Sequence, residues 1–263
     1  MIISNSHDFV LLRVPKVAST SVTMAIYDSD LVSLGKDYCP GLEREYFPEE
    51  DRSHKGRLAI NSHVFEAVIK SGRRYEWESW WPWVIKDPMF YAHATYSQLV
   101  QMKLIVDGMP SFATIRHPVD RFLSVWSFLL TGLRSMGKQH EAAFANTSSS
   151  TAKLLNLDPN EFFDVFMTMK VEGDMKKTPL VFVEMFRKPQ TYWGNKDTKY
   201  WAIENINQDL AKLFKDKGVE EFKVRHLKKD GRNKKRDLLS ADRQKAIIEN
   251  YQKDFITWEN LQD

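Results

Sequence analysis

The stretch FVLLRVPKVASTSV (Phe9–Val22) contains a short apolar run, a turn and the start of a helical pattern. Residues Phe9–Val14 are almost all apolar and rich in β-forming side chains, which predicts a strand buried on both faces. The run ends at Pro15, and a helical pattern resumes at about Ser21. The stretch therefore predicts a strand, a tight turn and a helix in succession.

The same succession occurs again further along the chain. Phe112–Ile115 predicts a second buried strand, Arg116–Pro118 a turn, and Val119–Leu130 a helix with one apolar face. Repeated strand–turn–helix units favour a parallel sheet with helices on its faces. We therefore predict a three-layer α/β fold in which a parallel sheet forms the central layer. We expect it to be a single domain over residues 1–263.

Weaker patterns predict further elements. Asp158-Pro159-x-Glu161 is typical of a helix that opens with an N-cap, an N1 proline and an N3 acid, and that helix is expected to reach Lys170. The remaining predicted elements are helices at Thr95–Val106, Asn205–Lys217 and Ser240–Trp258, and short strands at Trp83–Ile85 and Tyr200–Ile203.

Composition excludes several classes of protein. With 43% hydrophobic and 28% charged residues among 263, the chain is globular in character. Lys and Arg (38) nearly balance Asp and Glu (35), so we expect no nucleic-acid partner, and any basic site must be local. One cysteine, Cys39, excludes an intrachain disulfide and argues against a cysteine-based zinc site. No apolar stretch approaches the roughly 18 residues of a membrane span, and no signal peptide is recognisable, which predicts a cytoplasmic protein.

The first predicted turn has the composition of an anion site. A helix that starts directly after the turn presents unpaired N–H groups and partial positive charge, which attract phosphate. Lys16 adds a full charge, and hydroxyl donors come from Ser19, Thr20 and Ser21. The alternative is a Ser/Thr-rich helix cap beside a surface lysine. The turn lacks GxxxxGK[ST], so a nucleoside-triphosphate P-loop is a poor fit.

The second predicted turn, within RHPVDRFLSVW (Arg116–Trp126), offers a second anion site. Arg116 lies at the end of the strand, and Ser124 follows eight positions later on the helix. A guanidinium fork and a hydroxyl together can hold one phosphate. Arg121 is expected to brace the turn.

Together, PKVASTS and RHPVDRFLSVW resemble the two nucleotide-binding signatures of sulfotransferases that use 3′-phosphoadenylyl sulfate (PAPS). The chain is most similar to the carbohydrate branch with the 2-O- and 4-O-sulfotransferases of glycosaminoglycans. One departure is His117, where the family usually has Asn or Asp. The segments that also fit, from residue 9 to about 258, are Pro189–Trp193, Ile203–Ile206, Asp209-Leu210 and Tyr251-x-x-Asp254-Phe255.

The resemblance implies the P-loop-NTPase-like sulfotransferase fold and transfer of a sulfuryl group from PAPS to an acceptor hydroxyl, with PAP (adenosine 3′,5′-bisphosphate) released and no metal required. It implies that the first turn binds the 5′-phosphosulfate and the second the 3′-phosphate. The donor-binding residues expected from the two turns are Pro15, Lys16, Val17, Ala18, Ser19, Thr20, Ser21, Arg116 and Ser124. In the basic loop Lys228–Arg236, Lys229 and Arg232 are expected to cover the nucleotide, unless this loop is only a solvated charged turn.

Two catalytic tasks remain, and the sequence suggests residues for each. Lys16 is expected to stabilise the leaving phosphate electrostatically. A base must accept the acceptor's proton, and His93 is the first choice because related carbohydrate enzymes have a catalytic histidine at a similar place. The alternatives for the base are His63, Glu66 and Glu78.

The acceptor is predicted only as a hydroxyl, on a carbohydrate according to the resemblance. Acceptor contacts are expected at His63, Trp81 and Gln190, and the aromatic segment at residues 75–83 either stacks on sugar rings or packs in a core. Two other classes stay open: a nucleotide kinase-like P-loop enzyme, and a non-catalytic protein that binds polyanions or carbohydrates.

Overall fold

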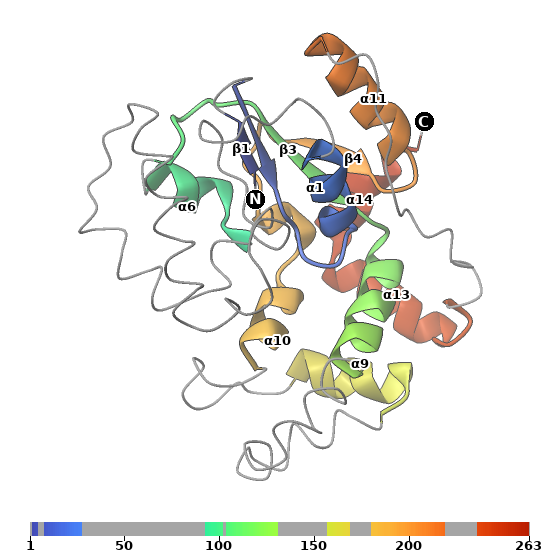
Figure 1. Ribbon diagram of the computed structural model, residues 1–263. Helices are drawn as coiled ribbons and strands as arrows, with labels where there is room; N and C mark the ends of the chain where they lie inside the picture. The colour runs from blue at the N-terminus through green and yellow to red at the C-terminus, as the bar shows by residue number, and fades with distance from the viewer. Residues whose placement is uncertain are drawn as a thin grey trace, which may run out of the picture. The chain divides into compact units, whose positions relative to one another are not determined.

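The strands of the described residues form one mixed sheet with the order β1-β2-β3-β4 (Figure 1). They are β1 (Ile2–Ser4), β2 (Phe9–Leu12), β3 (Ser111–Ile115) and β4 (Lys199–Ala202). β2 pairs in parallel with β3, and β3 in parallel with β4, whereas β1 runs antiparallel to β2. The computed structural model describes residues 2–4, 8–27, 93–101, 104–130, 157–168, 180–218 and 236–262.

The sheet confirms the predicted α/β class and its parallel strands. Every side chain of β2 and β3 is buried, as expected for strands that are covered on both faces. The antiparallel strand β1 was not predicted, since only three residues take part in it. The predicted strand at Trp83–Ile85 lies outside the described residues.

The chain folds into two compact units. The first contains residues 1–14, 18–115 and 191–227, and the second contains residues 15–17, 116–190 and 228–263. The second unit thus takes in the turn 15–17 together with the segment that begins at Arg116. The single domain over the whole chain stays a prediction.

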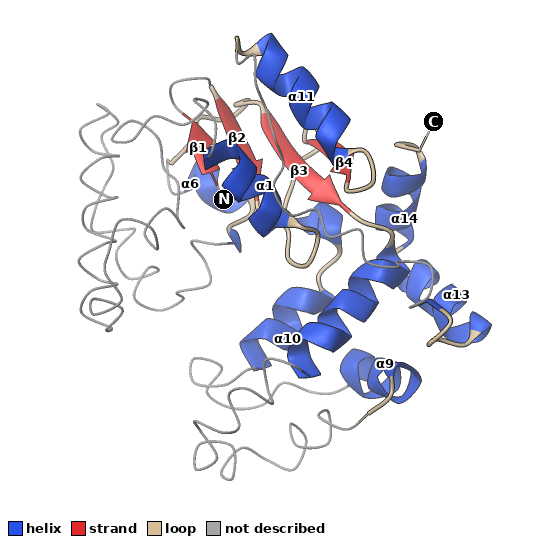
Figure 2. Ribbon diagram, turned by 45° about the vertical axis from the view of Figure 1, so that its right-hand side comes forward, coloured by secondary structure: helices blue, strands red, loops and turns tan. Residues whose placement is uncertain are grey.

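The core of the first unit lies between the sheet and two helices, α1 (Ser19–Tyr27) and α11 (Ile206–Asp216), which Figure 2 shows beside the strands. In the sheet, the rings of Phe112 and Trp201 stack with their centroids 4.7 Å apart. The side chains that pack together in this core are Ile2, Phe9, Leu11, Val22, Ile26, Phe112, Trp201, Ile206, Leu210, Leu213 and Phe214.

The helix predicted over Thr95–Val106 is shorter than expected. It is α6 (Tyr96–Gln101), and the chain bends at residues 104–105, where the Leu104 N–H donates to the carbonyl of Leu99. The Tyr96 hydroxyl accepts a hydrogen bond from the Gly108 N–H at 2.9 Å. That contact requires the chain to turn back toward the start of the helix, which apolar spacing alone does not reveal.

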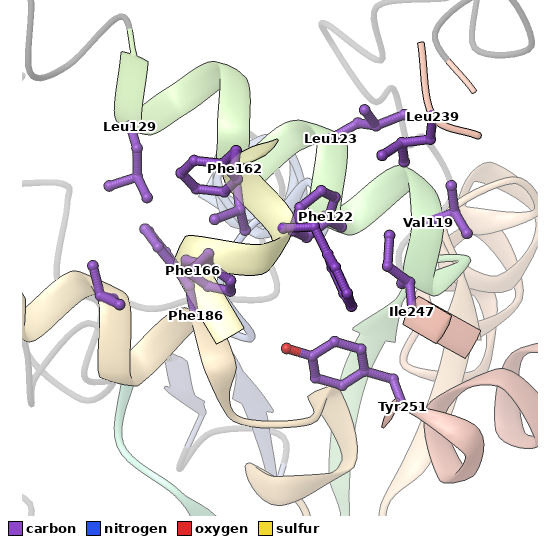
Figure 3. Close-up of a cluster of buried hydrophobic side chains, with 13 residues drawn as sticks. Val119, Phe122, Leu123, Leu129, Phe162, Phe166, Phe186, Leu239, Ile247 and Tyr251 are labelled. Carbon is purple, nitrogen blue, oxygen red and sulfur yellow. The ribbon is translucent and has the colours of Figure 1, made fainter. Parts of the chain in front are cut away.

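The second unit is a cluster of helices around an aromatic core (Figure 3). Its helices are the one over residues 118–130, α9 (Pro159–Thr168), α10 (Leu180–Arg187), α13 (Ala241–Asn250) and α14 (Gln252–Glu259). Phe162 and Phe166 stack at 5.2 Å, and Phe122 packs against both rings. The helix α10 was not predicted from the sequence.

The predicted single helix over Ser240–Trp258 is wrong, because the chain breaks it at Tyr251. Tyr251 has φ −119° and ψ 36°, outside the helical region, and separates α13 from α14. Its ring is buried in the aromatic core, and the following turn buries Asp254 completely. Apolar spacing runs through the break without interruption, so the two helices looked like one.

Candidate functional site

The turn between β2 and α1 has an unusual backbone. Lys16 and Ala18 have φ values of 66° and 57°. These values lie in the left-handed region, which residues other than glycine rarely adopt. Each such residue costs about 1–3 kcal/mol and persists only where the surroundings enforce it. Left-handed residues in a turn can direct successive N–H groups to one side, which creates a concave site for an anion. Helix α1 follows at Ser19, with its own unpaired N–H groups.

The side chain of Lys16 lies over an aromatic ring and within electrostatic range of Arg116. Its Nζ is 4.2 Å from the ring centroid of Phe128, close enough for a cation–π interaction. Burial, and then the positive charge of Arg116, lower the pKa of Lys16 from 10.5 to about 8. The fold thus holds two cations from distant segments near each other, an arrangement typical of an anion-binding site.

The backbone of Arg116 is held on both sides by one amide. Gln190 Oε1 accepts from the Arg116 N–H at 2.9 Å, and Gln190 Nε2 donates to the Arg116 carbonyl at 2.8 Å. Gln190 is fully buried, and its own N–H donates to Asp254 Oδ2 at 2.6 Å. In the sequence, Gln190 and Asp254 stand out only as members of segments that resemble a family. The contact of Gln190 with the acceptor stays a prediction, and these hydrogen bonds assign its amide to Arg116.

Arg121 lies behind the turn that carries Lys16. Its Nε donates to the carbonyl of Pro15 at 3.3 Å, and its Nη1 to the carbonyl of Lys188 at 3.0 Å. The side chain is only 3% exposed. These bonds agree with the expectation that Arg121 braces a turn, although the turn it contacts is the first one.

A partly buried ion pair lies near Arg116. Arg236 contacts Asp120 through two parallel bonds, Nε to Oδ1 and Nη2 to Oδ2, both 2.8 Å long. Burial raises the pKa of Asp120, but the hydrogen bonds and charge of Arg236 and the charge of Arg116 outweigh it and lower the pKa below the usual value. Asp120 therefore remains a carboxylate. The two neighbouring cations, Arg116 and Arg236, leave an excess of positive charge around it.

His117 packs away from solvent beside this ion pair. Its ring meets those of Phe255 and Trp258 edge to face, and its Nδ1 accepts from the Val119 N–H at 3.2 Å. Burial and then Arg236 lower its pKa to about 4. The histidine that departs from the family pattern is thus a neutral, packed side chain.

The remaining predicted donor residues differ in exposure. Pro15, Val17 and Ser19 are buried, so Pro15 and Val17 offer an anion only backbone atoms. Ala18 and Ser21 are half-buried, as is Ser124 on the helix over residues 118–130. The predicted residues that lie outside the described residues are His63, Glu66, Glu78, Trp81, Lys229 and Arg232, together with Cys39, and the side chain of Thr20 is not described either.

His93 belongs to the first unit and is held at two points. Its Nδ1 lies 2.5 Å from the carbonyl of Arg13, and its own carbonyl accepts from Trp193 Nε1 at 2.7 Å. A carbonyl only accepts, so Nδ1 carries the proton and Nε2 keeps a free lone pair. Burial is the main reason why the pKa of His93 falls to about 3, so the ring is neutral near pH 7. Arg13 precedes Lys16 by three residues in the chain.

Two general features of the described residues bear on the site. No group of three or more His, Cys, Asp or Glu side chains within the described ranges is arranged to hold a metal ion. No described helix combines the length and the apolar character that a membrane crossing needs.

Comparison with known proteins gives a match to a family model. No curated protein and no solved structure matches the chain. A model described as the sulfotransferase family matches residues 1–258, a range that includes the turns after β2 and β3 and most of α14. A match over nearly the whole length establishes sulfuryl transfer as the general activity of the protein. The chain belongs to the sulfotransferase family.

Proposed function

We propose that the protein transfers a sulfuryl group from PAPS to a hydroxyl group of a carbohydrate and releases PAP. The observation that carries the proposal is the left-handed turn at Lys16 and Ala18, whose ammonium lies within electrostatic range of Arg116. PAPS has one anionic group at each end of its ribose, and the two turns supply one cation each. Family membership supports the sulfuryl transfer, and the resemblance of the two turns supports the donor.

For binding, the proposal assigns one turn to each phosphate. The left-handed turn and the start of α1 would receive the 5′-phosphosulfate, with hydroxyls from Ser19, Thr20 and Ser21. Arg116 and Ser124 would receive the 3′-phosphate. Lys229 and Arg232 remain candidates for covering the nucleotide.

For chemistry, Lys16 would act on the leaving group. The acceptor oxygen attacks sulfur in line, the bond between sulfur and the bridging oxygen breaks, and its electron pair passes to the 5′-phosphate of PAP. An ammonium directed at that oxygen stabilises the charge as it develops. With a pKa of about 8, Lys16 is mostly protonated at pH 7, and a bound phosphate raises its pKa again.

His93 is the proposed base for the acceptor's proton. The bond from Nδ1 to Arg13 leaves Nε2 unprotonated, which is the form that a base requires. A pKa of about 3 makes the free histidine a weak base, and the negative charge of a bound donor acts to raise it. His63, Glu66 and Glu78 remain the alternatives.

The carbohydrate acceptor is proposed from the resemblance and from the aromatic segment at residues 75–83, with Trp81 as one contact. A screen with radiolabelled PAPS across glycans, phenols, lipids and peptides tests it. We expect transfer to a glycan, whereas transfer only to a phenol, lipid or peptide contradicts the acceptor and leaves the donor intact.

The donor itself is tested by thermal shift. PAP and PAPS should raise the unfolding temperature in the presence of EDTA, and ATP should not. Stabilisation by ATP only with magnesium favours a nucleotide kinase-like enzyme. Stabilisation by PAP without transfer to any acceptor favours a non-catalytic binding protein.

A further inference from the structure

Three buried polar side chains of the second unit form hydrogen bonds with the two turns or with one another. They are Arg121, Gln190 and Asp254, with exposures of 3%, 0% and 0%, and we call them the buried brace. Burying polar groups is costly unless they are hydrogen-bonded, so the contacts of these three side chains decide what the brace does.

The first contact fixes Arg116. A side-chain amide that accepts from the N–H and donates to the carbonyl of one residue restrains that residue against rotation and translation. Arg116 lies directly after β3, where its backbone has left the hydrogen-bond ladder of the strand. Gln190 thus pairs with the Arg116 backbone just beyond the end of β3.

The second contact fixes the turn of Lys16. Arg121 donates to the carbonyl of Pro15, the residue directly before Lys16, and anchors itself on Lys188. The cavity beside Arg121 has a volume of about 10 Å³, room for about one water molecule. Arg121 is only 3% exposed, so its effect on a bound anion passes through the turn.

The third contact joins these two. Asp254 accepts from the Gln190 N–H at 2.6 Å and lies 3.4 Å from Gln190 Nε2. Burial lowers the pKa of Arg121, whereas Tyr251 and Asp254 raise it again. The charge of Asp254 thus offsets part of the cost of burying the Arg121 guanidinium, and one carboxylate serves both halves of the brace.

We infer that Arg121, Gln190 and Asp254 are positioning residues that set the spacing between the Lys16 ammonium and the Arg116 guanidinium. This inference rests on the proposed function, because the spacing matters for a donor that carries both a 5′- and a 3′-phosphate. Two like charges repel each other, so without the brace the turns relax apart and no longer match both phosphates. A ligand with a single phosphate does not depend on the spacing.

Gln190→Met tests the inference, because it keeps the length of the side chain and removes both bonds to Arg116. We expect the Kd for PAP to rise about tenfold, since small displacements at such sites cost up to roughly a hundredfold. The Kd for 5′-AMP should change little, so the preference for PAP over 5′-AMP should fall. The KM for the acceptor tests a separate prediction, because it should rise only if Gln190 also contacts the acceptor.

Asn160→Leu is the matched control. The Asn160 amide also holds a backbone from both sides, donating to the Leu238 carbonyl at 3.0 Å and accepting from the Ser240 N–H at 2.9 Å. The control should lose less stability than Gln190→Met, because its hydrogen bonds are exposed, and should not change the preference for PAP. If Gln190→Met does not fold, Gln190→Asn replaces it. The shorter amide adds no charge to the buried site but reaches Arg116 less well, so its preference for PAP should lie between that of the wild type and no preference.

The outcomes separate this inference from the proposed function. A folded Gln190 variant with the wild-type preference for PAP overturns the inference alone. A wild-type protein that binds PAP no better than 5′-AMP overturns the proposed donor, and the inference with it. A lowered preference for PAP supports the inference, and a raised acceptor KM beside it would support the separate contact of Gln190 with the acceptor.

Discussion

Substitution of Lys16 by methionine removes the ammonium and keeps an unbranched apolar stem over the ring of Phe128. If Lys16 stabilises the leaving phosphate, this variant loses one electrostatic contact that matters most in the transition state. Removal of one such donor costs about 3–4 kcal/mol, which corresponds to about a 10²–10³-fold fall in kcat. We therefore expect kcat to fall by that factor.

The same substitution should not reduce the stability of the fold. The folded protein lowers the pKa of Lys16 from 10.5 to about 8, so at pH 7 the charged lysine is less favourable folded than unfolded. The full shift would be worth about 3 kcal/mol, and solvent reaching the half-buried side chain reduces this to about 1–2 kcal/mol. Loss of the cation–π contact offsets about 0.5–1 kcal/mol. We expect the unfolding midpoint of Lys16→Met to equal or exceed that of the wild type.

The assay combines turnover with calorimetric titration of PAP at several pH values. In the wild type, affinity for PAP should fall as the pH rises above about 8, because the free protein then loses the Lys16 proton. Lys16→Met should bind PAP more weakly and lack this fall. Lys245→Met is the control, since Lys245 has a side chain that is 78% exposed and lies in α13.

Two results would refute the reasoning about Lys16. Turnover of the variant within a few-fold of the wild type would remove Lys16 from catalysis. An unchanged fall in PAP affinity above pH 8 in the variant would show that another group titrates there.

Two further predictions concern histidines. His93→Asn keeps a donor for the Arg13 carbonyl and removes the proposed base, so kcat should fall about 10²–10⁴-fold with PAP affinity unchanged; activity within a few-fold of the wild type contradicts this role. Burial, and then Arg236, lower the pKa of His117 to about 4, so the unfolded chain binds its proton at higher pH and folding stability should decrease as the pH falls from about 6.5 to 4. Urea unfolding at pH 7, 5.5 and 4.5 measures this decrease, and an equal decrease in His117→Gln would exclude His117 as its source.

Local sequence patterns were sufficient where short-range contacts determine the structure. The helix predicted to open at Asp158 does so as α9, with Asp158 Oδ1 accepting from the Glu161 N–H at 3.0 Å and Glu161 Oε2 accepting from the Asp158 N–H at 3.3 Å. The strands predicted at Phe9 and Phe112 are β2 and β3 within one or two residues. Dense apolar runs, turn residues and caps act over a few positions, so the sequence displays them directly.

Long-range contacts determined the rest of the candidate site. Gln190 and Asp254 are separated by 64 positions, and Gln190 and Arg116 by 74, so no local pattern links them. The left-handed backbone of Lys16 and Ala18 could not be predicted either, because neither residue is a glycine.

The sequence by itself determined the α/β class, the two turns that follow β2 and β3, and the charged residues on them. Only the tertiary structure decided that Lys16 and Arg116 lie within electrostatic range, that buried side chains hydrogen-bond to the Arg116 backbone and the Pro15 carbonyl, and that α13 and α14 are separate helices. The physical reason is that charge and hydrophobicity belong to each residue, whereas a buried hydrogen bond exists only when two distant segments meet away from water.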